Sequence, residues 1–166
     1  MDYNKINRSR FPELIEKNRG MIHKVSLMYT NNRADKEDMY QEICLQLWKA
    51  IGNYREEASL STWLYRVALN TAINSLRSKA RRISTEELIP ERHYTVKDNQ
   101  KEDQTSLLFA AISKLNKIDK ALILLWLEDK KYDEITEITG LKRSNVSVRL
   151  VRIRKKLKDI IKQIEK

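Results

Sequence analysis

Residues 131–157 read KYDEITEITGLKRSNVSVRLVRIRKKL, and this stretch decides the fold of the last third of the chain. Its first half places Ile135 and Ile138 on one helical edge, and Gly140 supplies the left-handed residue that commonly ends a helix. Its second half has apolar residues at intervals of four, three and four, which place them on one buried helical stripe: Val146, Leu150, Ile153 and Leu157. Two short helices joined by a tight turn predict a helix-turn-helix, whose second helix lies in a DNA major groove.

The charge of this C-terminal stretch supports the same interpretation. From Lys142 to Lys166 there are ten Lys or Arg residues against Asp159 and Glu165, so the segment carries most of the chain's net charge of +10. A cationic helix gains affinity for DNA by releasing the counterions that surround the phosphates. The alternative is a solvated basic helix on a helical bundle. The Ile-x-x-Ile-x-Gly-Leu turn in front of the helix favours DNA binding.

The composition predicts an all-α protein. Three Gly and two Pro among 166 residues leave little material for tight hairpins, and no stretch shows a sustained alternation of polar and apolar residues. The longest apolar run, from Ala121 to Leu127, is too short to cross a bilayer, so we expect no membrane insertion. The first ten residues lack the apolar run of a secretion signal, and a cytoplasmic location is therefore expected.

The single cysteine, Cys44, excludes an internal disulfide bond and is too little for a cysteine zinc site. Neither histidine, His23 nor His93, has a metal-ligand spacing to it. Cys44 falls on an apolar helix face, so we expect it in the core. The sequence therefore predicts neither a metal nor a cofactor.

Two helices are expected at the N-terminal end, from about Phe11 to Tyr29 and from about Ala34 to Ile51, with Asn32 as the cap of the second. The core stripe expected for the second is Met39, Ile43, Leu47, Ala50 and Ile51. Its opposite side carries Asp38, Gln41, Glu42 and Lys49, with Leu45 among them and Trp48 at the edge of the stripe. An apolar side chain ringed by acids and amides indicates a partner surface, although a lone surface leucine is also normal.

A third helix is expected to start at a Ser59 or Ser61 cap and to run to about Arg82. We expect its core face to be Leu60, Leu64, Val67, Ala68 and Thr71, with Leu76 near the edge. The other face carries aromatic, guanidinium and amide groups at steps of three and four, followed by further cations: Trp63, Arg66, Asn70, Asn74 and Arg77, then Lys79, Arg81 and Arg82. Such groups on one face favour nucleic-acid binding, because they can stack on bases, bond base edges and contact phosphates.

A polar segment separates this part from the C-terminal helices. It reads as a flexible linker, despite a helical fragment expected at Thr85 to Leu88. A second set of helices is expected from Ser106, with an Asn116 cap and an apolar wall for the helix-turn-helix at Ile123, Leu124, Trp126 and Leu127. The predicted organisation is therefore two small helical domains, 1–82 and 106–166, joined by a linker at 83–105.

Three segments in this order resemble a known family. DMYQEICLQLW at 38–48, YREEASLSTWLYR at 54–66 and a terminal helix-turn-helix that ends in RIRKKL at 152–157 resemble bacterial RNA polymerase sigma factors of the extracytoplasmic function group. The similarity spans about Phe11 to Leu157. It implies a promoter-specificity subunit with core RNA polymerase and promoter DNA as partners, and an anti-sigma factor as a further partner to be tested.

The resemblance also implies roles for particular residues. The helix at 38–48 would dock on the clamp helices of the polymerase largest subunit through Asp38, Gln41, Glu42, Leu45 and Trp48. The segment at 53–63 would capture an unstacked base, and the next helix would read the downstream promoter element, through Asn53, Tyr54, Ser59, Trp63, Arg66, Asn70, Asn74, Arg77, Arg81 and Arg82. The last helix would read the upstream element through Lys142, Arg143, Ser144, Asn145, Ser147, Val148, Arg149 and Arg152.

Four positions depart from the family pattern. Glu56 replaces a common Gly in the base-capture loop, Thr136 stands where a small Ala usually packs, and Lys142 takes the place of a capping Ser. Val148 replaces a polar residue, and its side chain suits contact with a thymine methyl group. Promoter sequence therefore cannot be transferred from relatives.

Two other functions are alternatives to a sigma factor. A polymerase-independent helix-turn-helix regulator would use its N-terminal part to dimerise and would bind a palindromic site. A metal-dependent nuclease would use Asp35, Glu37, Asp38 and Glu42 as ligands, but acids at a helix start are ordinary partners of the helix dipole.

Overall fold

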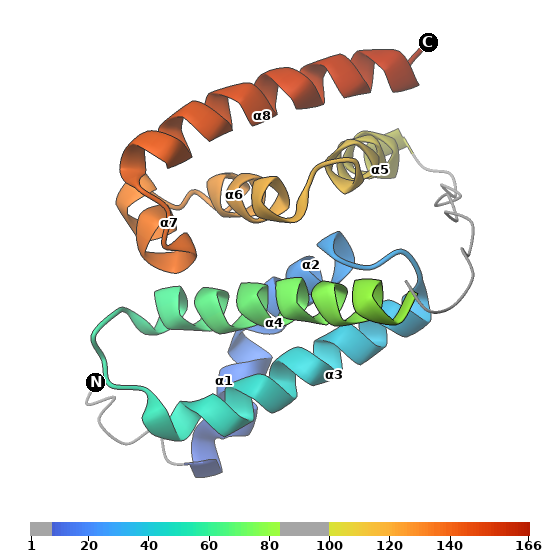
Figure 1. The fold of residues 1–166 in the computed structure, drawn as a ribbon. Helices are drawn as coiled ribbons and strands as arrows, with labels where there is room; N and C mark the ends of the chain where they lie inside the picture. Colours follow the sequence, from blue (N-terminus) through green and yellow to red (C-terminus); the bar gives the residue numbers. More distant parts are fainter. Residues whose placement is uncertain (1–7, 84–99) are drawn as a thin grey trace. The chain divides into compact units, whose positions relative to one another are not determined.

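A computed structural model describes the backbone of residues 8–83 and 100–166, and the side chains of residues 8–78 and 104–166. All regular elements in these ranges are helical, which confirms the all-α prediction (Figure 1). The chain divides into an N-terminal unit, Met1–Glu91, and a C-terminal unit, Arg92–Lys166. The fragment expected at Thr85 to Leu88 lies outside the described residues. None of the described helices has an apolar stretch long enough to span a membrane.

The prediction of one continuous helix from about Phe11 to Tyr29 is wrong in one respect, because the helix is interrupted at Asn18. A short 3-10 turn, η1 (Arg8–Arg10), leads into α1 (Phe11–Lys17), and α2 (Arg19–Met28) follows. At Asn18 the backbone leaves the helical region (φ −108°, ψ 12°), and its side-chain amide donates to the Leu14 carbonyl oxygen at 2.8 Å. An asparagine side chain that bonds the backbone competes with helix continuation, which accounts for the break.

Helix α3 (Arg33–Ala50) begins where the sequence predicted. The Asn32 side chain caps it by accepting from the Asp35 backbone N–H at 2.8 Å. Its buried face is Met39, Ile43 and Leu47, and Ile51 of the following turn η2 (Ile51–Asn53) is buried beside them, while Ala50 is only partly buried. Cys44 is also only partly buried rather than in the core, and burial still raises the pKa of its thiol. This face packs α3 against α2 and α4.

Helix α4 (Leu60–Ile83) is capped by Ser59, whose hydroxyl accepts from the Thr62 N–H at 3.2 Å. Its core face differs from the expected one. Leu60, Val67 and Thr71 are only partly buried, and the buried residues are Thr62, Leu64, Tyr65, Ala68, Leu69 and Ala72. Because α4 contacts both α2 and α3, the buried arc is centred between those two neighbours and is turned away from Val67 and Thr71.

The C-terminal unit holds α5 (Gln100–Ser113), α6 (Lys117–Leu127), α7 (Tyr132–Thr139) and α8 (Arg143–Ile164). Helix α5 starts at Gln100, earlier than the expected Ser106, and so includes the end of the predicted linker. Asn116 caps α6 as predicted, by accepting from the Asp119 N–H at 2.9 Å. In the apolar wall Ile123 and Leu124 are buried, but Leu127 is exposed and does not belong to the wall.

The turn between α7 and α8 is the predicted helix-turn-helix turn. Gly140 adopts a left-handed conformation with φ 73°, and its N–H donates to the Thr136 carbonyl oxygen at 2.9 Å, which ends α7. The predicted stripe of α8 is buried, at 5% exposure or less, against α5, α6 and α7: Val146, Leu150, Ile153 and Leu157. The face of α8 turned away from this stripe is left for other contacts.

Candidate nucleic-acid and partner-binding surfaces

The first residues of α8 place polar and cationic groups at the surface. Lys142, Arg143, Ser144, Asn145 and Arg152 are exposed, and Ser147 is half-buried. Val148 is also exposed, at 49%. Since the opposite side of the helix is packed, these side chains lie where a recognition helix contacts base edges. Ser147 and Arg149 lie at the flanks of this surface.

Arg149 forms an internal bond instead of extending into solvent. Its Nε and Nη2 atoms both donate to Oδ1 of Asp119 on α6, at 3.1 and 2.7 Å. The other carboxylate oxygen, Oδ2, accepts from the Asn116 side-chain amide at 2.9 Å. The Arg149 side chain is 36% exposed and that of Asp119 is 16% exposed. The guanidinium therefore fixes α8 to the start of α6.

Two other cations of α8 are also held within the C-terminal unit. Nη1 of Arg143 pairs with the carboxylate of Asp133 on α7. The Arg154 guanidinium lies over the Trp126 ring, 5.1 Å from its centroid. The first contact joins α8 to α7, and the second joins α8 to α6. The sequence predicted the cations of α8 but not these partners, because the partners lie on other helices.

Two departures from the family pattern can be seen around the same turn. Lys142 is the N-cap residue of α8 and forms no side-chain cap hydrogen bond within the described structure. The Thr136 hydroxyl is buried and has no hydrogen-bond partner among the described residues. A Ser in place of Lys142 would supply the missing cap hydrogen bond. An Ala in place of Thr136 has no hydroxyl, so it would leave no buried polar group without a partner.

The α4 face consists of Trp63, Arg66, Asn70, Asn74 and Arg77. Asn70, Asn74 and Arg77 are exposed, whereas Trp63 and Arg66 are half-buried. All five remain on the surface of one helix, so the structure brings this predicted set together. The side chains of Lys79, Arg81 and Arg82 lie outside the described residues, although α4 continues through these positions.

The loop before α4 is organised by aromatic and backbone contacts. The rings of Tyr54 and Trp63 lie 5.3 Å apart, and the Tyr54 hydroxyl donates to the Ala58 carbonyl oxygen at 2.7 Å. Ser59 forms the helix cap and also bonds the Thr62 hydroxyl at 3.0 Å, and Asn53 is exposed. Glu56 has φ 57°, the left-handed region that favours glycine. The loop therefore keeps a glycine-type conformation without the glycine.

The α3 face consists of Asp38, Gln41, Glu42, Leu45 and Trp48. The three polar residues are exposed, Leu45 is 44% exposed and Trp48 is 37% exposed. Oε1 of Glu42 accepts from the Gln46 side-chain amide at 2.8 Å. The structure thus keeps two large apolar side chains at the surface among acidic and amide groups, as the sequence predicted.

The sequence did not predict two neighbours of Trp48. The Phe11 ring meets the Trp48 ring edge-on at 5.1 Å, and the Arg8 guanidinium lies 5.1 Å from its centroid. Both come from the start of the described chain, before and at the beginning of α1. Periodicity within α3 contains no signal for them, because they reach Trp48 only through the packing of the N-terminal turn.

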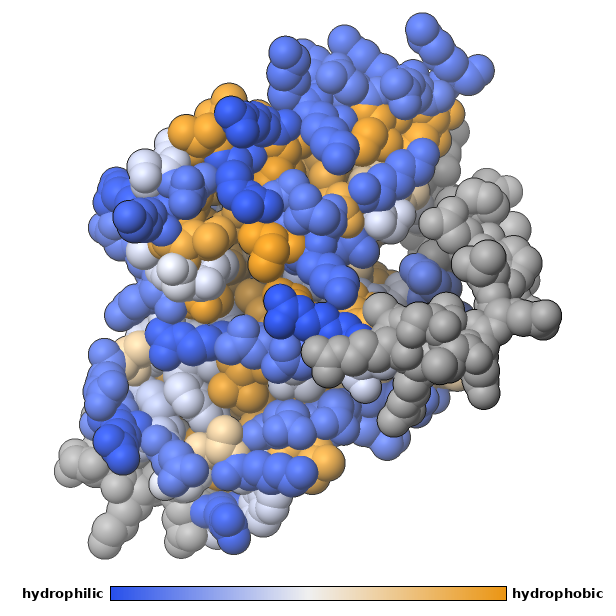
Figure 2. All heavy atoms as spheres, in the orientation of Figure 1, coloured by the Kyte–Doolittle hydropathy of each residue, from blue (hydrophilic) through white to orange (hydrophobic). Residues whose placement is uncertain are grey.

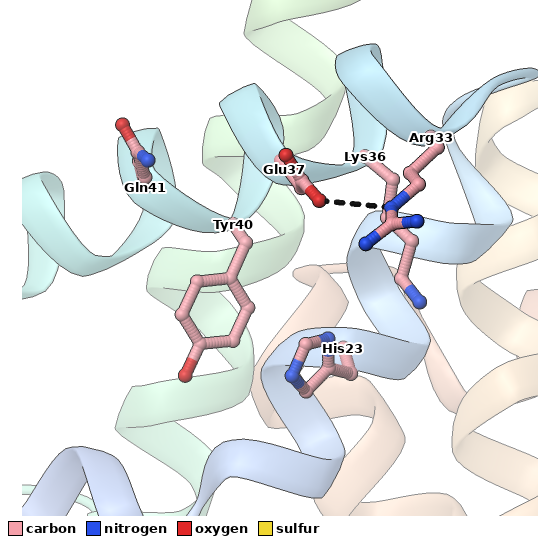
Figure 3. Close-up of a pocket in the computed structure, with 6 residues that line it drawn as sticks. All are labelled: His23, Arg33, Lys36, Glu37, Tyr40 and Gln41. Atoms are coloured by element: carbon pink, nitrogen blue, oxygen red, sulfur yellow. Dashed lines mark hydrogen bonds and ion pairs between the residues drawn. The ribbon is translucent and has the colours of Figure 1, made fainter.

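A shallow pocket of about 340 Å³ lies beside the α3 face, between α2 and the first turns of α3 (Figure 3). The ring of His23 on α2 lies 4.5 Å from that of Tyr40 on α3, and Arg33 pairs with Glu37 at 3.1 Å along the rim. Burial, followed by the positive charges of Lys36 and Arg19, lowers the pKa of His23 below its ordinary value. The ring is therefore neutral near pH 7.

Three of the four acids considered for a nuclease form local bonds with neighbouring side chains. Asp35 accepts from the Asn32 side-chain amide at 2.8 Å, Glu37 pairs with Arg33, and Glu42 accepts from Gln46. No cluster of three or more His, Cys, Asp or Glu side chains suited to a metal ion occurs in the described part of the chain. The geometry therefore gives the nuclease hypothesis no support.

Comparisons with known proteins match both units. The family model "Sigma-70 region 2" matches residues 14–82, and "Sigma-70, region 4" matches residues 106–157. The ECF RNA polymerase sigma-E factor of Haemophilus influenzae is 29% identical over 147 residues, covering 80% of this chain and 78% of that protein. The RNA polymerase sigma factor SigV of Bacillus subtilis is 28% identical over 133 residues, covering 79% and 78%.

Two solved structures share the fold. The sigma factor RpoE, crystallised with the anti-sigma factor NepR from Bartonella quintana, has a TM-score of 0.79 at 16% identity, covering 92% of this chain and 96% of that chain. CnrH in complex with the cytosolic domain of CnrY has a TM-score of 0.64 at 18% identity, covering 95% and 91%. The family matches follow the same order along the chain as the two units described above.

Proposed function

The chain belongs to the sigma-70 family, in the extracytoplasmic function group of RNA polymerase sigma factors, and from this we propose how its surfaces divide promoter recognition. The protein is a sigma factor that directs RNA polymerase to promoters. The observation that carries the assignment is the presence, in one chain, of a region 2 match over α1 to α4 and a region 4 match over α5 to α8. Nothing in the described residues favours a polymerase-independent regulator.

The α3 face is the proposed polymerase contact. Its exposed Leu45 and Trp48 provide apolar anchors, and Asp38 and Glu42 provide negative charge around them. Apolar anchors inside a polar rim are the usual composition of a protein interface. In a chain whose net charge is +10, this acidic patch is suited to a basic protein surface and not to DNA.

Two surfaces are the proposed DNA contacts. The α4 face, with Asn53, Tyr54 and Ser59 in the preceding loop, would bind the opened downstream element, where Tyr54 and Trp63 offer aromatic surface to an unstacked base. The outward face of α8 would read the upstream element. Its proposed contacts are Lys142, Arg143, Ser144, Asn145, Ser147, Val148 and Arg152. Because Arg149 is bonded to Asp119, we assign it the role of positioning α8.

This division of labour suggests the domain boundaries. Residues 1–82 would bind polymerase and the downstream element, 83–105 would connect, and 106–166 would bind the upstream element. Sigma factors are transcription initiation factors, and we propose no catalytic role for this chain, since polymerase supplies the chemistry. The same function would place the protein in the cytoplasm, where the template and the polymerase are.

An anti-sigma factor is a proposed further partner. The structurally similar RpoE was crystallised in complex with the anti-sigma factor NepR. The α3 face here exposes large apolar side chains, Leu45 at 44% and Trp48 at 37%. A protein that covered this face would prevent polymerase from reaching it, so binding of the two partners should be mutually exclusive.

A matched pair of leucine variants tests the polymerase contact. Leu45→Ala should weaken assembly with core RNA polymerase by about tenfold, as loss of an interface anchor does. The control is Leu127→Ala, which truncates an equally exposed leucine on α6 (41% against 44%) and should leave assembly unchanged. Affinities would be measured with labelled full-length protein, with circular dichroism as the check on folding. Equal affinities for the two variants would refute the α3 assignment.

A further inference from the structure

Helix α8 has an exposed stripe that repeats the spacing of its buried one. The buried stripe falls at positions 146, 150, 153 and 157, and the positions two residues earlier are Ser144, Val148, Val151 and Lys155. A shift of two residues turns the helix by about 200°. The exposed stripe therefore points directly away from the core of the C-terminal unit. Val148 is 49% exposed and Val151 is 56% exposed.

Positive charge follows the two valines along the helix. Arg152, Arg154, Lys155 and Lys158 are exposed on the same helix, and its first acid is Asp159. Figure 2 shows the same mixture at the surface of the C-terminal unit, where hydrophobic residues are visible between hydrophilic ones. The occupant of this surface must therefore combine negative charge with small apolar groups. In the major groove of DNA, phosphates supply the charge and the methyl group of thymine is the apolar group that projects from a base edge.

The distances along the helix fit neighbouring bases. Three residues advance an α-helix by about 4.5 Å, and successive base pairs are about 3.4 Å apart along DNA. Val148 and Val151 can therefore reach methyl groups on adjacent or next-but-one base pairs. Arg149 lies between them in sequence, but its guanidinium is turned towards Asp119, so it does not cover the stripe.

We propose that Val148 and Val151 together read thymine methyl groups in the upstream promoter element and thereby help to set its sequence preference. This inference rests on the proposed function, because it assumes that α8 contacts upstream DNA. It adds Val151 to the recognition surface and removes Arg149 from base reading. Discrimination here depends on the methyl group itself and not on a hydrogen bond.

Replacing thymine by uracil tests this directly, because uracil lacks only the methyl group. Templates carrying a promoter mapped for this protein would have each upstream thymine replaced singly. Holoenzyme assembled from core polymerase and the full chain should form open complexes roughly fourfold less well at one or two positions, the effect of one buried methyl group. With Val148→Ala/Val151→Ala the thymine template and the uracil templates should all be equal. Their common level should be at or below that of wild type on a uracil template, because the double variant loses the contacts of both valines.

The matched control is Ile164→Ala, which truncates a 40% exposed apolar residue near the end of the same helix and should keep the full thymine preference. Alanine favours a helix, so the double variant should fold. Three results would overturn the inference: no thymine effect in wild type, a thymine effect that survives the double variant, or an equal loss on both templates. The last would place the valines against protein. Failure of wild-type holoenzyme on every template would instead count against the proposed function.

Discussion

The carboxylate of Asp119 holds the guanidinium of Arg149 across thirty residues of sequence, with two donors, Nε and Nη2, on a single oxygen, Oδ1, at 3.1 and 2.7 Å. This bond ties the first turn of α6 to the second turn of α8. The remaining oxygen accepts from Asn116, the residue that caps α6. The helix cap, the carboxylate and the guanidinium thus form one connected network that orients α8, whose outward side is the proposed DNA contact.

A double-mutant cycle measures this network. Arg149→Lys cannot reproduce the paired donors, and we expect it to lower the free energy of unfolding by about 1 kcal/mol, the range for a partly exposed charged hydrogen bond. The same change in an Asp119→Ala background should cost much less, because the partner is already absent. Arg152→Lys, one turn away on the exposed side, is the matched control and should have no effect on stability. Additive losses in denaturant titrations would show that the pair is not coupled.

Replacing Glu56 with glycine, the common residue at this position in the family, should stabilise the protein. A non-glycine residue in the left-handed region carries a cost of about 1–2 kcal/mol, partly offset by the greater chain entropy that glycine loses on folding. We therefore expect Glu56→Gly to raise the free energy of unfolding by roughly 0.5–1 kcal/mol. Glu57→Gly changes an adjacent exposed acid whose φ is not positive, and it should give no gain. Stability would be measured by denaturant titration. If the unfolding midpoint moved equally in both variants, that would argue against strain at Glu56.

Replacing Lys142 with serine should raise the stability of the protein and lower its affinity for DNA. A serine at this N-cap position would bond the first turn of α8, so Lys142→Ser should stabilise the protein by about 1 kcal/mol. Lys142 is also a proposed DNA contact, so loss of its positive charge should weaken DNA binding by holoenzyme and, as for one phosphate contact, lower its salt slope by about one. Lys142→Ala removes the cation without adding a cap, and it should reproduce only the weaker binding. If Ser and Ala variants melt at the same temperature, the cap assignment fails.

The lowered pKa of His23 predicts that the protein loses stability in mild acid. Its pKa is lowered in the folded protein, chiefly by burial and then by Lys36 and Arg19, from the ordinary value of 6.5. Below about pH 6.5 the unfolded chain therefore binds a proton that the folded chain resists, and the free energy of unfolding falls as the pH falls. His23→Phe keeps a ring beside Tyr40 but cannot titrate. The fall between pH 6.5 and 5 should be smaller in this variant, while both proteins should show the same slope between pH 7 and 8.

Local patterns in the sequence were enough to predict the elements that depend on short-range chemistry. Gly140 and the stripe of α8 identified the helix-turn-helix, and the Asn32 and Asn116 caps lie where they were expected. The core face of α4 was harder, because apolar residues occupy more than half of its circumference. Contact with both α2 and α3 selects Tyr65, Leu69 and Ala72 over Val67 and Thr71.

The predicted surfaces show a similar division. The α3 and α4 faces follow from helical period alone, and the structure keeps their residues on one side of each helix. The partners of Arg149 and Trp48 could not be predicted, because Asp119, Phe11 and Arg8 reach them only through tertiary packing. Period alone also assigns equal exposure to every outward residue. Burial and bonding in the folded unit show which outward cations of α8 are already paired.

Initiation by purified core polymerase is the most direct measurement of the central claim, that one chain both binds the enzyme and selects its promoters. Core polymerase lacking any other sigma factor would transcribe fragmented genomic DNA with and without the full-length protein, and the transcript starts would be sequenced. We predict a limited set of new starts that share two elements upstream, and their loss with Leu45→Ala but not with Leu127→Ala. Identical starts with and without the protein would contradict the account.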